Sequence, residues 1–155
     1  EEVKLLGESY HLKMVERSKI ETIDSKQSLV EEIIILDTIG ELAALYTIAT
    51  IAFVGGSLVN KGGHNLFEPV ISGKPVLFGP YIQDFKESAD LLQKNRIGMM
   101  VSNEDELKNE ILLLLRDENR RQEIRGKAEE LLAKEKGATE RSIEIVERVV
   151  ENARG

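Results

Sequence analysis

The sequence predicts an α/β fold in which a Rossmann-like parallel sheet carries helices on both faces and ends in several helices. Short apolar runs of β-branched and aromatic residues are typical of strands that are buried on both faces. A helical segment follows each run, and strands that alternate with helices pair in parallel through right-handed crossovers. The four runs that predict strands are residues 33–36, 51–54, 75–78 and 97–101.

The run IIIL at residues 33–36 is the strongest indication of a buried strand. Residues 10–15 alternate weakly and predict a further strand, and the polar residues 17–30 predict a surface loop. Beyond the last strand, Ser102 with Asp105 three residues on has the spacing of a capping box, and Gly137 predicts the end of a helix. Helices are also expected at residues 39–49, 65–73 and 84–94.

Length and composition exclude several classes of protein. The 155 residues suffice for one domain with a core, and the net charge of −7 argues against a general nucleic-acid binder. The absence of cysteine excludes disulfides, thiolate metal sites and a cysteine nucleophile. No apolar run approaches the 18 residues that would predict a membrane-spanning helix. The chain begins with Glu1 rather than methionine, from which we expect a fragment of a longer protein.

Function is expected in the stretch IAFVGGSLVNKGGHNLFEPVISGKPVLFG, residues 51–79. It reads as a strand, a loop with four glycines, a short helix and a second strand. Backbone N–H groups and the positive end of a helix dipole would then meet beyond the carboxyl end of the first strand. Anionic ligands bind at such places in open parallel sheets.

Within this stretch, Gly62, Gly63, His64 and Asn65 can hold a phosphate through backbone amides, since glycine lets the backbone approach a ligand closely. An ordinary tight turn explains the same residues about as well. His64 can contact the phosphate or only fix the loop. No histidine–acid pair accompanies Ser57 in a nucleophile elbow, which argues against a serine hydrolase.

Glu68 lies three residues after Asn65, so their side chains are expected on one face of the helix. A carboxylate there can accept hydrogen bonds from two ribose hydroxyls, as acidic residues do in Rossmann proteins. The alternative is a solvated glutamate of a helix surface. Pro69 is tolerated only in a first helical turn, which places the helix start just before Glu68.

A second strand-to-helix junction carries Asp37, Thr38, Ile39 and Gly40. Its backbone can read the edge of a base, whereas Thr38 or Asp37 can equally be only an N-cap. No dinucleotide fingerprint, no Walker loop and no cluster of metal ligands appears, so neither a cofactor nor a metal is expected.

Three segments resemble the C-terminal domain of the 3-deoxy-D-manno-octulosonic acid (Kdo) transferases. They are DTIGELAALY at residues 37–46, FVGGSLVNKGGHNLFEPV at 53–70 and GKPVLFGPYIQDFK at 73–86. These glycosyltransferases use the two-domain GT-B fold and move Kdo from CMP-Kdo onto a lipid A precursor in lipopolysaccharide biosynthesis. The resemblance implies that residues 1–155 are a C-terminal donor-binding domain, truncated at its N-terminus, without the N-terminal acceptor domain.

The resemblance also implies residue roles. Gly63, His64 and Asn65 would lie along the donor phosphate, Glu68 would hold the ribose, and Gly56 and Ser57 would line the cleft near the Kdo carboxylate. The backbone of Thr38, Ile39 and Gly40 would meet the cytosine. Asp84 stands where the family usually has asparagine, which leaves a donor role for that position in question.

By the same resemblance, the catalytic base belongs to the N-terminal domain, so this fragment alone is expected to be inactive. CMP-Kdo and the lipid A precursor are the implied partners, and the cytoplasmic face of the bacterial inner membrane is the implied location. Two alternatives stay open: the nucleotide-binding half of another GT-B enzyme that uses a UDP-sugar, such as an epimerase, and a non-catalytic α/β domain.

Overall fold

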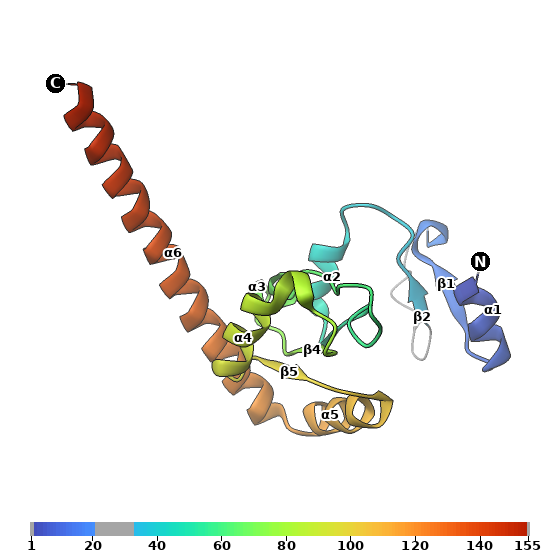
Figure 1. Cartoon of the computed structure of the whole chain (residues 1–155). Helices are drawn as coiled ribbons and strands as arrows, with labels where there is room; N and C mark the ends of the chain where they lie inside the picture. The colour runs from blue at the N-terminus through green and yellow to red at the C-terminus, as the bar shows by residue number, and fades with distance from the viewer. Residues whose placement is uncertain (1, 21–32, 155) are drawn as a thin grey trace. The chain divides into compact units, whose positions relative to one another are not determined.

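The structure, a computed structural model, describes residues 2–20 and 33–154, and side chains for 3–20 and 33–136. The chain forms two compact units, Glu1–Leu45 and Tyr46–Gly155. Their elements are labelled in Figure 1. The expected loop at residues 17–30 lies mostly outside the described residues, beyond a 3-10 turn, η1 (Arg17–Lys19).

The first unit is built on two parallel strands. Strand β1 (Met14–Glu16) pairs with β2 (Ile33–Ile35), with Met14 opposite Ile33. Helix α1 (Glu2–Ser9) precedes β1, and α2 (Leu42–Ile48) begins at the end of the unit. The strand expected at residues 33–36 and the following helix are therefore confirmed.

The burial expected for β2 is wrong within this unit. Ile33 and Ile34 are 42% and 41% exposed, although three consecutive isoleucines are typical of a fully buried strand. The described part of the unit supplies only two strands, one eight-residue helix, the 3-10 turn η1 and the start of α2, which is too little structure to cover both faces. Burial of a strand depends on neighbours that its own sequence does not contain.

The second unit contains a three-stranded parallel sheet in the order β3–β4–β5. Its strands are β3 (Ala52–Val54), β4 (Val76–Phe78) and β5 (Gly98–Met100), and Val76 lies opposite both Ala52 and Gly98. All described strands pair in parallel, which confirms the α/β prediction. They form a pair and a triplet rather than one sheet.

Helices pack around this triplet and close its core. The central strand β4 is buried at every residue, together with Leu66, Leu92 and Leu114 from the segments around it. Helix α4 contacts β5, while α3 and α5 both contact α6. The elements are α3 (Phe67–Ile71), η2 (Gln83–Phe85), α4 (Lys86–Lys94), α5 (Glu104–Arg116) and α6 (Glu118–Arg154).

Two sequence predictions at the C-terminal end are wrong. The cap of α5 is Asn103, whose Oδ1 accepts from Glu106 N–H at 2.9 Å, while Glu106 Oε2 accepts from Ser102 N–H at 2.7 Å. The capping box therefore lies one residue after the predicted pair. Gly137 does not end a helix, because α6 continues to Arg154 (Figure 1). Strong helix formers surround that glycine and no proline follows it, so a cost of about 1 kcal/mol is tolerated.

Candidate functional site

The loops that follow β3 and β4 are joined to each other at the carboxyl ends of their strands. Ser57 is fully buried, and its hydroxyl donates to Val54 C=O at 2.5 Å and accepts from Gly79 N–H at 2.8 Å. Its own carbonyl accepts from Tyr81 N–H at 2.9 Å. The two loops thus form one rim beyond the sheet, where parallel α/β folds bind ligands.

The rim requires glycine at position 79. A Cβ atom there would lie 2.2 Å from the carbonyl oxygen of Ser57, well inside any tolerated contact. The GKPVLFGP segment supplies a residue without a side chain at the point where the two loops touch. Glycine here is a requirement of close backbone approach.

The glycine-rich loop takes the backbone conformation that the sequence predicts. Gly56, Gly62 and Gly63 have φ angles of 75°, 84° and 73°, a region that favours glycine. The ring of His64 lies over Gly56, since a Cβ on that glycine would be 3.9 Å from His64 Nε2. The loop is anchored by Leu66, which is completely buried, while His64 and Asn65 are exposed. The loop backbone and the His64 imidazole therefore face solvent, while Leu66 holds the loop in the core.

Asn65 and Glu68 lie on one face, as their spacing predicts. Asn65 Nδ2 donates to Glu68 Oε1 at 3.5 Å, and Asn65 Oδ1 accepts from Phe67 N–H at 2.9 Å. Pro69 is the third residue of α3 and so falls in its first turn, which is also as predicted. The Glu68 carboxylate is exposed and is available for a ligand's hydroxyl groups.

Helix α3 is shorter than the sequence analysis expects, with five residues rather than nine. A helix dipole grows with the number of aligned peptide units, so its field at the loop is weak. Any phosphate bound here would depend on the backbone N–H groups of the loop and on His64, more than on the dipole.

Tyr46, on α2, lies close enough to Glu68 for the carboxylate charge to act on its hydroxyl, and sequence reasoning did not single it out. Partial burial, and then the negative charge of Glu68, raise the pKa of the Tyr46 hydroxyl. The tyrosine therefore stays a neutral phenol near the carboxylate at physiological pH. Its position eleven residues after the end of β2 gives no local signal, because only the tertiary fold brings it toward Glu68.

Ser57 is placed differently from the cleft-lining role that the resemblance implies. With its side chain buried and its hydroxyl bonded on both sides, it offers no free hydroxyl to a ligand. Its neighbour Gly56 is half-buried beside His64. Ser57 acts here as a structural bridge, and Gly56 is the member of this pair that reaches the surface.

Thr38, Ile39 and Gly40 lie in the first unit, on the loop between β2 and α2. The Thr38 hydroxyl donates to the Glu41 side chain at Oε2, a structural contact other than the N-cap that the sequence left open. The side chain of Ile39 is fully exposed, and Gly40 has a φ of 90°. The backbone of this loop tip is thus accessible.

A separate hollow of about 1000 Å³ lies between β5, α5 and α6. Charged side chains line it, and several are already paired, as Arg120 with Glu110 and Lys127 with Glu123. None of the predicted donor-site residues borders it. Among the described residues, no group of three histidine or acidic side chains is placed to hold a metal ion, and no helix is long and apolar enough to cross a membrane.

The family of the chain is decided by comparison with curated proteins. A Kdo transferase from Aquifex aeolicus is 39% identical over 106 residues, which are 64% of this chain and 30% of the relative. One from Chlamydophila psittaci is 35% identical over 150 residues, 88% of this chain and 34% of the relative. The chain is a relative of the Kdo transferases. It spans about a third of the length of these two relatives.

Two further comparisons concern a glycosyltransferase sequence and a solved fold. A bifunctional glycosyltransferase/methyltransferase from Fusobacterium nucleatum is 43% identical over 100 residues, which are 64% of this chain and 16% of that protein. The C-terminal CMP-Kdo binding domain of WaaA from Acinetobacter baumannii matches the fold with a TM-score of 0.74. At 24% identity, that match covers 84% of this chain and 66% of the other. No family model matches the chain.

Proposed function

We propose that residues 1–155 are the donor-binding C-terminal domain of a Kdo transferase, which binds CMP-Kdo in a GT-B enzyme of lipopolysaccharide biosynthesis. The observation that carries the proposal is the rim beyond β3 and β4, where Gly63, His64, Asn65 and Glu68 are presented together on the anchor of Leu66. The Kdo transferase relatives and the CMP-Kdo binding domain with the same fold support it.

We assign the residue roles as the resemblance to the Kdo transferases implies them. The N–H groups around Gly63 and the ring of His64 would stabilise the phosphate, and Asn65 would lie beside it. Glu68 would accept hydrogen bonds from the two ribose hydroxyls, with the neutral Tyr46 hydroxyl close by. Gly56 would line the cleft toward the Kdo carboxylate, and Ser57 would contribute through the backbone that it holds. Thr38, Ile39 and Gly40 would meet the cytosine through their backbone.

In the proposed reaction, an acceptor hydroxyl of the lipid A precursor attacks the anomeric carbon of Kdo. The new carbon–oxygen bond forms as the bond to the CMP phosphate breaks, and the hydroxyl proton passes to a base of the N-terminal domain. The leaving phosphate gains charge as the bond breaks, so N–H donors fixed around it lower the barrier. The transfer would take place at the cytoplasmic face of the inner membrane, where the acceptor lipid lies.

The test is an assay of the full-length protein with CMP-Kdo and a lipid A precursor, in which CMP release and Kdo-bearing lipid are both measured. We expect transfer, no activity from residues 1–155 alone, and unchanged rates after a metal chelator is added. Donor hydrolysis without transfer, or no reaction in the full-length protein, would contradict the proposed activity. Activity of residues 1–155 alone would contradict the placement of the base.

A further inference from the structure

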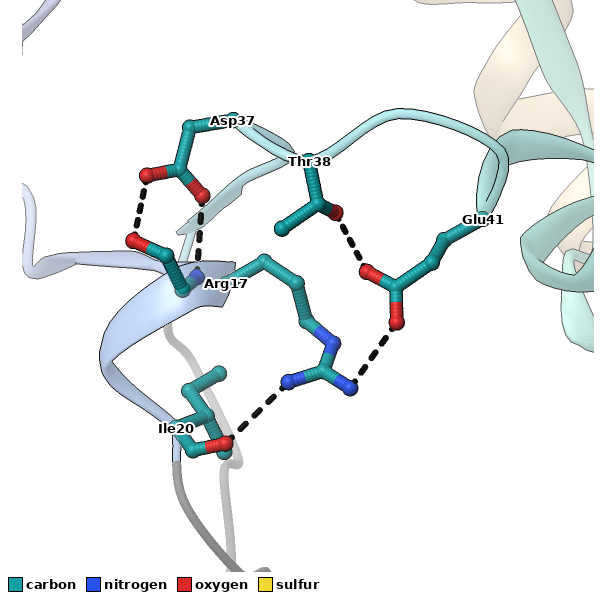
Figure 2. A network of polar contacts seen from close by, with 6 residues as sticks. Arg17, Ile20, Asp37, Thr38 and Glu41 are labelled. Atoms are coloured by element: carbon teal, nitrogen blue, oxygen red, sulfur yellow. Dashed lines mark hydrogen bonds and ion pairs between the residues drawn. The ribbon is translucent and has the colours of Figure 1, made fainter.

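The loop between β2 and α2, residues 37–41, is held at both ends by residues of η1 (Figure 2). At one end, the Asp37 carboxylate accepts from the Ser18 N–H at 2.9 Å and from the Ser18 hydroxyl at 2.5 Å. At the other end, Arg17 donates to Glu41 Oε1 at 3.0 Å. These two contacts tie the loop to one short turn of the same unit.

Each partner of the Arg17–Glu41 pair has a second anchor. The other terminal nitrogen of Arg17 donates to Ile20 C=O at 3.1 Å, which fixes the guanidinium plane. The second carboxylate oxygen of Glu41 accepts from the Thr38 hydroxyl, across the base of the loop (Figure 2). Glu41 therefore links η1 on one side with the start of the loop on the other.

The contacts leave Ile39 and Gly40 at the tip of the loop. The Ile39 side chain is 102% exposed, so it contributes nothing to the core. Among the described residues, no hydrogen bond engages the backbone N–H of Ile39 or of Gly40. A loop held firmly at its base thus presents at its tip two backbone N–H groups that have no hydrogen-bond partner among the described residues.

Stability does not account for the Arg17–Glu41 pair. The side chains of Arg17 and Glu41 are each 38% exposed, and an ion pair this accessible to water contributes little to the free energy of unfolding. Its main effect is to restrict the conformations of the loop. Restricting a loop matters most where its backbone has to meet a ligand in one geometry.

We propose that Arg17 and Glu41 are positioning residues that hold the backbone of Ile39 and Gly40 in the orientation that distinguishes the pyrimidine base of the nucleotide. This inference rests on the proposed function. Cytosine presents an amino donor beside a ring-nitrogen acceptor, whereas uracil presents a carbonyl acceptor beside an N–H donor. A peptide N–H and a peptide C=O held side by side can tell these patterns apart only if the loop keeps its shape.

The experiment measures dissociation constants of CMP, UMP and ribose 5-phosphate for the full-length protein by NMR titration. Glu41→Ala removes the link to Arg17 and to Thr38, and Glu41→Gln restores one acceptor oxygen. Glu129→Ala is the matched control, because Glu129 forms a comparable exposed pair with Arg125 at 3.1 Å on α6. We expect Glu41→Ala to reduce the preference between CMP and UMP by about tenfold, the factor for one lost hydrogen bond.

The affinity for ribose 5-phosphate should be unchanged in all variants, and Glu41→Gln should recover part of the base preference. A wild-type base preference that survives in Glu41→Ala would overturn the inference and leave the proposed function standing. A wild-type preference for UMP that Glu41→Ala abolishes would support the positioning role and contradict the CMP-Kdo assignment. If the wild type binds neither nucleotide, both proposals fail.

Discussion

The buried hydroxyl of Ser57 accepts a hydrogen bond from the backbone N–H of Gly79 at 2.8 Å, and so fastens the loop after β3 to the loop after β4. The same hydroxyl donates to Val54 C=O at 2.5 Å. One small side chain thus satisfies a donor and an acceptor that are both withdrawn from water. These two hydrogen bonds of Ser57 hold together the loops that carry the candidate donor site.

Ser57→Ala should lower the free energy of unfolding by about 1–3 kcal/mol, because it leaves a buried N–H and a buried C=O without these partners. Chemical denaturation followed by circular dichroism measures the change. Ser102→Ala is the control, since Ser102 is exposed and its bond to Glu106 uses the backbone N–H, which alanine keeps. Equal free energies of unfolding for the two variants would show that the hydrogen bonds of the Ser57 hydroxyl do not stabilise the protein.

Gly79→Ala should be more damaging, at about 2 kcal/mol or more, because its Cβ would lie 2.2 Å from the Ser57 carbonyl oxygen. Gly126→Ala is the matched substitution on exposed α6, where a Cβ meets nothing within 4 Å. It should stabilise the protein by up to about 1 kcal/mol, through helix propensity. In thermal unfolding, the close approach at Gly79 predicts a lower midpoint temperature for Gly79→Ala and a higher one for Gly126→Ala. Midpoint temperatures that change in the same direction in both variants would contradict the close approach at Gly79.

Glu68→Ala should weaken CMP binding by about 1.5–3 kcal/mol, the scale of hydrogen bonds to a charged group. The loss should be much smaller for deoxy-CMP, which lacks one of the two hydroxyls that the carboxylate would hold. Isothermal titration calorimetry of the full-length protein measures both. Glu87→Ala, in the first turn of α4, serves as a control for a lost surface charge. The same loss for both nucleotides would assign Glu68 to the structure of α3 instead.

The loop at Asp37 should respond to acid. Hydrogen bonds from the Ser18 hydroxyl and N–H hold the pKa of Asp37 below its ordinary value. Because the folded pKa is lowered, the stabilisation is present above the ordinary aspartate pKa of about 3.9 and is lost as the pH falls through the folded value. Ser18→Ala should raise the Asp37 pKa in a carboxyl NMR titration. Ser9→Ala, which removes a hydroxyl bonded to Leu6 C=O, should leave it unchanged.

The strands were predictable from sequence because parallel strands in an α/β core are short apolar runs bounded by glycine and proline. The stretch at residues 51–79 shows this, since β3, the glycine loop and β4 all lie where the pattern places them. Pro69 also fixed the start of α3 closely, because proline is excluded from later turns. These features are local, and local chemistry determines them.

Other features depend on contacts between distant residues. The exposure of Ile33 and Ile34 reflects how little of the first unit covers β2, and the burial of Ser57 reflects its meeting with Gly79, 22 positions away. Tyr46 joins the site only because α2 approaches Glu68. The cap of α5 shifted from Ser102 to Asn103 because both residues can cap a helix, and only the backbone geometry selects one.

The most direct test of the account is a titration of the full-length protein with CMP and with UMP, read from backbone amide chemical shifts. We expect CMP to bind more tightly and to shift the amides of Gly63, His64, Asn65 and Gly40. A preference for UMP at the same amides would contradict the CMP-Kdo assignment and favour an enzyme that uses a UDP-sugar. No shift at these amides with either nucleotide would contradict the donor site itself.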